Sequence, residues 1–203
     1  MNRPVGLALA PGIHETKLRL IAVGLRLLLA QGYNATGVQE IVDEAKVPKG
    51  SFYHHFASKE EFALLAIDAY QQRIHDLLEA TLTDERHPPL DRVRLFFASV
   101  REAYEMEGYL GCFLGALGQE LSGTNDRFRH KINDCLSSIV AAHACCLEEA
   151  RLRGDLPFTC DARLAAELLV NAWEGAALRS RLVRNGRPLD DILDSWPSVI
   201  AVR

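Results

Sequence analysis

The chain has 203 residues, a formal net charge of −4 and an apolar fraction of 48%. This length fits one large domain or two small ones, and the apolar fraction can bury a sizeable core, which argues against intrinsic disorder. No run of about 18 apolar residues is present, so we expect no membrane span.

Charge is unevenly distributed along the chain. Residues 1–59 contain seven Lys/Arg and four Asp/Glu, a net +3, whereas residues 60–203 contain sixteen and twenty-three, a net −7. A basic N-terminal end suits a protein that presents this end to phosphates. Chance variation in surface charge is the alternative explanation.

The N-terminus and the cysteines bear on where the protein works. Residues 1–12 lack a basic region followed by a long apolar core, so we expect a short arm and not a signal peptide. The five cysteines are odd in number and suggest no small disulfide framework. We therefore expect reduced thiols and a cytoplasmic protein.

Helical periodicity dominates the chain, and strand-like alternation is nearly absent. The first helix is predicted at residues 14–31, with one apolar stripe made of Leu18, Ile21, Leu25 and Leu28. The second is predicted to begin at Thr36, which forms a capping box with Gln39. The others are predicted at residues 49–56, 58–82, 90–107, 112–121, 126–153, 161–184 and 189–200. The prediction is an all-α protein of about nine helices.

Residues 36–62 have the order of helix, tight turn and second short helix that is typical of a helix-turn-helix DNA reader. Pro48 suits the start of the second short helix, because its missing N–H is no loss there. Phe52 and Phe56 recur at i, i+4, so we expect both to face inward. A second capping box, Ser58 with Glu61, opens the next helix.

In a helix-turn-helix the second helix lies in the major groove. Gly50 and Ser51 are small enough for close approach to base edges, and Lys49 can donate to a guanine or a phosphate. Lys59 begins the next helix, where backbone N–H groups also favour a phosphate. The candidate DNA contacts are Thr36, Lys46, Lys49, Gly50, Ser51, Tyr53, His54 and Lys59. The alternative is an ordinary helical hairpin with these residues on its surface.

Three segments carry a resemblance to a known family: residues 32–36 (Gly-Tyr-Asn-Ala-Thr), 47–56 (Val-Pro-Lys-Gly-Ser-Phe-Tyr-His-His-Phe) and 58–61 (Ser-Lys-Glu-Glu). They resemble the TetR family of repressors. The resemblance implies an all-helical homodimer in which three N-terminal helices bind a double-stranded DNA operator. The remaining helices would bind a ligand and form the dimer. We therefore predict a DNA-binding domain at 1–57 and an effector-binding and dimerisation domain at 58–203.

Two positions depart from the family pattern. Gly37 stands where relatives usually carry Ser or Thr, which removes one phosphate contact. Lys46 stands where many relatives carry Gly in the turn. A left-handed backbone there would cost Lys46 about 1 kcal/mol; alternatively, Lys46 adds a basic group near the DNA.

Residues 109–114 and 173–181 resemble one subgroup of this family, which includes repressors of electrophile-detoxifying reductases and acrylate-responsive repressors. The resemblance implies that Cys112 is a sensing thiol, and a place in the first turn of a helix favours the thiolate. Some relatives carry a lysine where this chain has Arg181. Arginine stays protonated and does not readily form the same covalent link, which leaves alkylation, a disulfide or non-covalent ligand binding. The alternative is that Cys112 is a small buried hydrophobe.

The helices after residue 58 offer candidates for a ligand pocket and for a dimer face. An apolar cavity with a few polar groups can be lined by Cys112, Tyr104, Tyr109, Phe113, Trp173 and Glu174. The alternative is ordinary core packing. The dimer face is predicted to contain Leu164, Leu168, Leu178, Leu182, Ile192 and Leu193.

We expect no metal site, because Cys135 and Cys146 lie about 16 Å apart along one helix, and His143 with Cys146 supplies only two ligands. No catalytic motif or cofactor signature is present. We predict a DNA-binding transcriptional regulator, a repressor released from a palindromic operator by a small molecule or a thiol-reactive electrophile. The alternatives are a repressor with purely non-covalent sensing, a thiol-dependent enzyme using Cys112 with His143, and a helical scaffold whose DNA end is vestigial.

Overall fold

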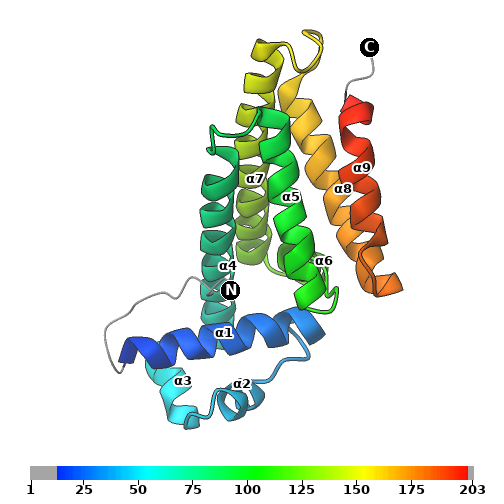
Figure 1. Cartoon of the computed structure of the whole chain (residues 1–203). Helices are drawn as coiled ribbons and strands as arrows, with labels where there is room; N and C mark the ends of the chain where they lie inside the picture. Colours follow the sequence, from blue (N-terminus) through cyan, green and yellow to red (C-terminus); the bar gives the residue numbers. More distant parts are fainter. Residues whose placement is uncertain (1–12, 201–203) are drawn as a thin grey trace. The chain divides into compact units, whose positions relative to one another are not determined.

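The computed structural model describes residues 13–200, and the arm predicted at residues 1–12 lies outside them. Helices account for most of this range, and no strand occurs in it (Figure 1). The helices are α1 (Ile13–Gln31), α2 (Val38–Glu44), α3 (Lys49–His55), α4 (Lys59–Leu82), α5 (Pro89–Met106), α6 (Phe113–Leu121), α7 (Asp126–Arg153), α8 (Ala162–Val183) and α9 (Arg187–Ile200). The predicted all-α fold is confirmed.

The chain divides into two compact units, with the division between Ala69 and Tyr70 inside α4. From the sequence we predict a domain boundary between residues 57 and 58, before α4. That functional boundary stays a prediction. Among residues 13–200 no helix is both long enough and apolar enough to cross a membrane.

Three phenylalanine rings form the centre of the first unit. Phe52 of α3, its C-cap Phe56 and Phe62 of α4 are at most 1% exposed, and their ring centroids lie 4.9–5.1 Å apart. Gly24 of α1 makes room for this cluster, because a Cβ there would lie 2.1 Å from Cζ of Phe62. The expected inward orientation of Phe52 and Phe56 is confirmed, and their packing fixes the short helix α3 against its neighbours.

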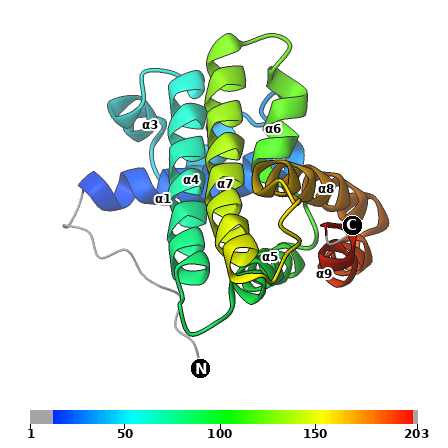
Figure 2. The ribbon, with the colours of Figure 1, turned by 90° about the horizontal axis from the view of Figure 1, so that it is seen from above.

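The second unit is built around α8, which packs between α7 and α9, as Figures 1 and 2 both show. Helix α5 contacts both α7 and α9, and α6 packs on α7. The predicted ends of the long helices are confirmed: Gly154 ends α7 in the left-handed conformation (φ 85°), and the Asp161 carboxylate accepts the Leu164 N–H at 3.0 Å to cap α8. These helices position the effector residues described below.

The capping box predicted at Thr36 is wrong. Helix α2 begins at Val38, and Gly37 is its N-cap without a side-chain hydrogen bond. Thr36 is fully buried and donates its hydroxyl to the Gly32 carbonyl at 2.6 Å, which ties it to the end of α1. By contrast, the box at α4 is present: Ser58 Oγ accepts the Glu61 N–H at 3.1 Å, and the Glu61 carboxylate accepts the Ala57 N–H at 2.7 Å.

Candidate DNA-binding surface and effector site

Helix α3 has one buried face and one exposed face. Phe52 is fully buried, whereas its neighbour Tyr53 is 55% exposed. Lys49, Gly50 and His54 are also exposed, and Ser51 is half-buried. Helix α3 contains no acidic residue, and nothing lies within 4 Å of a Cβ built on Gly50. The exposed face can therefore approach a polyanion closely, although the individual contacts stay a prediction.

The two remaining basic candidates flank α3. Lys46 is exposed in the turn before it, and Lys59 opens α4, where its Nζ lies 4.3 Å from the centroid of the Tyr33 ring. This cation–π contact fixes the direction of the Lys59 ammonium. Thr36 does not belong to this surface, because it is fully buried. The expectation that its side chain contacts DNA is therefore wrong.

Lys46 adopts the left-handed backbone conformation that the sequence raises as an alternative, with φ 54°. A side chain is strained there, so we expect Lys46→Gly to raise the free energy of unfolding by about 1 kcal/mol. If Lys46 meets a phosphate, the variant should also bind DNA more weakly and with a salt slope lower by about 1 per lost contact. Urea denaturation and DNA titration at several salt concentrations measure both effects.

Lys46→Ala is the matched control for this prediction, since it removes the charge and keeps the strain. It should lose the same DNA affinity as Lys46→Gly without any gain in stability. Equal free energies of unfolding for the two variants would contradict the claim that a side chain at residue 46 strains the turn.

A buried cluster in the second unit contains the candidate sensor thiol. Cys112 is the N-cap of α6, and its Sγ accepts the Gly115 N–H at 3.5 Å. The Glu174 carboxyl of α8 and the hydroxyls of Tyr104 of α5 and Tyr70 of α4 lie close enough to the thiol to interact with it electrostatically. Three helices besides α6 thus bring polar groups to one sulfur atom.

Two glycines, one just before α6 and one in its first turn, let this part of the chain lie directly on α8. A Cβ on Gly115 would be 2.5 Å from Oε2 of Glu174, and one on Gly111 would be 3.2 Å from the Ala177 carbonyl oxygen. Arg181, one turn further along α8, donates from Nη1 to the Leu110 carbonyl at 3.0 Å. Arg181, which stands where some relatives carry a lysine, is therefore hydrogen-bonded to the backbone beside the cluster.

The electrostatics of the cluster oppose a resting thiolate. Cys112 is only 8% exposed, and burial together with the Glu174 carboxyl raises the pKa of its thiol well above the usual range. Burial likewise raises the pKa of Glu174 and the pKa of Tyr104. Cys112 lies at the start of a helix as expected, but desolvation and a neighbouring carboxyl oppose the thiolate more strongly than the Gly115 N–H favours it.

The other predicted effector residues have different surroundings. Phe113 is buried with its ring centroid 5.1 Å from that of Tyr70. Tyr109 interacts through its hydroxyl with Glu105, and Trp173 packs on Phe97 at 4.7 Å. The place of Tyr70 in this cluster could not be predicted from the sequence, because Tyr70 lies about 40 residues before Cys112 and no local pattern links the two.

His143 does not join Cys112. Its ring is fully buried against Phe96 and Phe97, with centroids at 4.7 and 4.9 Å, and Nδ1 donates to the Ile139 carbonyl at 2.8 Å. Burial lowers the pKa of His143 to about 4, so the imidazole is neutral at pH 7. The enzyme alternative therefore lacks its thiol–imidazole pair. Within the described residues, no group of three or more His, Cys, Asp or Glu side chains is arranged to hold a metal ion.

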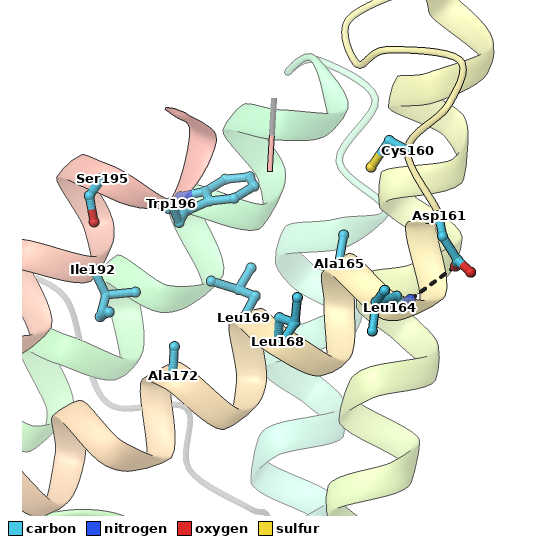
Figure 3. A pocket seen from close by; sticks show the side chains of 10 residues that line it. All are labelled: Cys160, Asp161, Leu164, Ala165, Leu168, Leu169, Ala172, Ile192, Ser195 and Trp196. Atoms are coloured by element: carbon cyan, nitrogen blue, oxygen red, sulfur yellow. Dashed lines mark hydrogen bonds between the residues drawn. The ribbon is translucent and has the colours of Figure 1, made fainter. Parts of the chain in front are cut away.

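Helices α8 and α9 present an apolar surface to solvent. Four leucines of α8 predicted for the dimer face are 44–70% exposed: Leu164, Leu168, Leu178 and Leu182. A groove of about 280 Å³ lies between the helices, with Leu164 and Leu168 on one wall and Ile192 and Trp196 on the other (Figure 3). Leu193 is 7% exposed and belongs to the core, so its assignment to the exposed face is wrong.

The helical fold and the exposed polar face of a short second helix after a tight turn define a helix-turn-helix DNA-binding protein. Residues 20–66 match the family described as bacterial regulatory proteins, tetR family, and residues 89–196 match the tetracyclin repressor-like C-terminal domain. The chain belongs to the TetR family of transcriptional regulators. Members of this family bind DNA operators and act as dimers.

Individual relatives agree with this assignment. The transcriptional regulator AcuR of Cereibacter sphaeroides is 38% identical over 93% of this chain and 85% of its own length. The repressor NemR of Escherichia coli K12 is 30% identical over 93% and 95%. A crystal structure of the regulatory protein TetR from Rhodobacter sphaeroides superposes with a TM-score of 0.86 at 36% identity, over 90% of this chain and 97% of that one.

Proposed function

We propose that this regulator is a repressor that binds a palindromic operator as a dimer and leaves it when a thiol-reactive electrophile modifies Cys112. The observation that supports the DNA contacts is the two-faced helix α3, with Phe52 fully buried and Tyr53 55% exposed. Lys46, Lys49, Gly50, Ser51, Tyr53, His54 and Lys59 are the proposed contacts.

The apolar surface of α8 and α9 supports the dimer arrangement. Exposed leucines on one helix face are costly in a monomer and are typical of an interface. A second copy of the chain that covers Leu164 and Leu168 would place two recognition helices on two half-sites. A symmetric operator is therefore the DNA to test.

Repressor function is supported by the description of NemR as a repressor. An electrophile as the releasing signal is supported by the thiol of Cys112 at the centre of a polar cluster. The second candidate is release by a ligand that binds without a covalent bond. The buried, protonated thiol favours that candidate, because thiols react mainly as thiolates.

Gel shifts with the DNA that flanks the gene of this protein test the DNA part of the proposal. We expect a sequence-specific complex whose affinity falls about 10³-fold or more between 50 and 200 mM salt. Lys49→Ala and Tyr53→Ala should weaken it, and Arg153→Ala, an exposed arginine of α7, should not. Binding that is indifferent to sequence, or equal in all variants, would contradict the proposal.

A further inference from the structure

The buried thiol of Cys112 has a carboxyl group beside it, and the groups that shift the pKa of this thiol are the Glu174 carboxyl, the Gly115 N–H and the Tyr104 hydroxyl, none of which is a basic side chain. Glu174 is the acidic partner, and Tyr70 and Tyr104 supply hydroxyls. Reactive cysteines usually lie next to a lysine, arginine or histidine that stabilises the thiolate. The surroundings of Cys112 therefore call for a different way of removing the thiol proton.

The fold builds this carboxyl contact specifically. Gly115, in the first turn of α6, has no side chain, and Oε2 of Glu174 occupies the space that a Cβ would need, 2.5 Å from it. The same Cβ would lie 3.6 Å from Cβ of Cys112. A glycine thus admits the carboxyl group into the turn that Cys112 caps, and any larger residue would push it away.

We infer that Glu174 accepts the proton of the Cys112 thiol when Sγ adds to the alkene of a neutral α,β-unsaturated carbonyl compound. The inference deepens the proposed function and rests on it for the identity of the site. It rests structurally on the contact of Glu174 with the thiol and on the space left by Gly115.

The step is a simple addition with no change in overall oxidation state. The Sγ–H bond breaks as Sγ forms a bond to the β-carbon, and the proton moves to the Glu174 carboxylate. The π electrons of the alkene shift towards the carbonyl oxygen, which can accept a hydrogen bond from a tyrosine hydroxyl of the cluster, Tyr104 or Tyr70. The proton then passes from Glu174 to the α-carbon, which regenerates the carboxylate.

Charge in the cluster selects a neutral electrophile. Glu174 lies against the thiol, and Glu107, the C-cap of α5, is close enough to Tyr70 to raise the pKa of its hydroxyl. The nearby arginines already interact with other groups, Arg73 with Glu107 and Arg181 with the Leu110 carbonyl. A carboxylate ligand would therefore add a negative charge beside Glu174 in a buried region, which is costly. Amides, imides, ketones and aldehydes carry the same conjugated alkene without that charge.

The titratable and charged groups around the thiol determine how its reaction rate depends on pH. They come from α4, α5 and α8 and comprise Tyr70, Arg73, Tyr104, Glu107, Glu174 and Arg181. Glu174 must be ionised to accept the proton, so the rate should rise with pH through the raised pKa of Glu174 and then stay level. Without Glu174 only the thiolate can react, and the rate should rise tenfold per pH unit.

The rate constant for alkylation of Cys112 by N-ethylmaleimide, measured from pH 5 to 9 in the full-length protein, tests the inference. The adduct is assigned to Cys112 by peptide mass spectrometry. We expect a plateau near neutral pH for the wild type and, for Glu174→Gln, a rate about 100-fold lower at pH 7, in the range of general base catalysis. The two curves should converge at high pH, because loss of the carboxylate also lowers the pKa of the thiol.

Two further variants keep the outcome interpretable. Gly115→Ala retains the carboxylate but displaces it, and should lose the plateau as Glu174→Gln does. Glu107→Gln removes a nearby carboxylate that acts on Tyr70 and is not among the groups that shift the pKa of the thiol, and should keep the plateau. Glu174→Gln reacting as fast as the wild type at pH 7, or Glu107→Gln losing the plateau equally, would overturn the inference.

Small electrophiles test the charge preference independently. Each rate constant is divided by the rate constant of the same reagent with N-acetylcysteine, which removes intrinsic reactivity. The normalised rate for acrylamide should exceed that for acrylate at least tenfold, and equal values would overturn the preference for a neutral electrophile. Alkylation that depends on Glu174 but leaves the operator complex intact would support this inference and contradict the proposed function.

Discussion

Phe52→Ala will unfold the DNA-binding unit and leave the second unit folded. Phe52 is fully buried, and its ring lies 5.1 Å from the rings of both Phe56 and Phe62. Truncation of a buried phenylalanine to alanine costs about 3–5 kcal/mol, which is a large part of the stability of a small domain. We therefore expect operator binding to be lost together with the helical content of α1, α2 and α3.

The chain offers a direct way to follow the two units separately. Both tryptophans, Trp173 and Trp196, lie in the second unit. Urea denaturation of Phe52→Ala should show an early loss of far-ultraviolet circular dichroism, while the midpoint by tryptophan fluorescence stays near that of the wild type. A single transition at the wild-type midpoint by both probes would contradict the packing described for Phe52.

Tyr53→Ala is the matched control for Phe52→Ala, because the two residues are neighbours on opposite faces of α3. Tyr53 is 55% exposed, so its truncation should change the free energy of unfolding by no more than about 0.5 kcal/mol. The same variant should still bind its operator less tightly. If Phe52→Ala loses stability and Tyr53→Ala loses only operator affinity, Phe52 contributes to folding and Tyr53 to DNA recognition.

Arg92→Ala will destabilise the second unit by about 2–3 kcal/mol, because it removes a buried guanidinium that donates to the buried Leu82 carbonyl and to the partly exposed Glu149 carboxylate. Arg92 is 4% exposed and donates to both oxygens of Glu149 at 2.9 Å, to the Leu82 carbonyl at 3.2 Å and to the His87 carbonyl at 2.8 Å. These bonds hold the loop between α4 and α5 against α7. The midpoint of unfolding by tryptophan fluorescence measures the loss.

Arg153→Ala is the control for Arg92→Ala, because Arg153 contacts the same carboxylate at 3.4 Å while its side chain is 51% exposed. An exposed pair of this kind contributes at most about 1 kcal/mol. Equal destabilisation by the two variants would contradict the claim that Arg92 contributes more to stability than Arg153 because it is buried.

The pH dependence of stability follows from the same pair. Arg92 lowers the pKa of Glu149 below its ordinary value of 4.5. A lowered pKa in the folded state means that the stabilisation is present above the pKa of the unfolded state and is lost as pH falls through the folded value. The loss of stability below about pH 4.5 should therefore be smaller in Arg92→Ala than in the wild type.

Local patterns predicted most of the fold. The glycine after α7 and the acid before α8 are local signals, and the structure places a helix end at each of them. The apolar period predicted α1 but only part of its buried face, because Leu20 and Leu27 are buried whereas Leu18 and Leu25 are half-buried. Thr36 shows the limit of such signals. A threonine three residues before a glutamine satisfies the capping pattern, but Thr36 is buried and bonds backwards to Gly32, so α2 begins two residues later.

The effector cluster was harder to predict, because its properties come from distant residues. Cys112 and Glu174 were recognised by resemblance, and the structure brings them together with Tyr104. Tyr70 was not predicted, and the raised pKa of the thiol could not be anticipated from the local sequence. Both depend on tertiary packing: α8 delivers a carboxyl group through the gap at Gly115, and burial removes the solvent that would stabilise a thiolate.

The measurement that tests the account most directly is operator release by N-ethylmaleimide, followed by fluorescence anisotropy of labelled operator DNA. The protein should carry Cys145→Ser, because the thiol of Cys145 is exposed and would also be alkylated. We expect N-ethylmaleimide to release this protein from the operator and to cause no release when Cys112→Ser is added. Equal release with and without Cys112, or a stable complex despite full alkylation of Cys112, would contradict it.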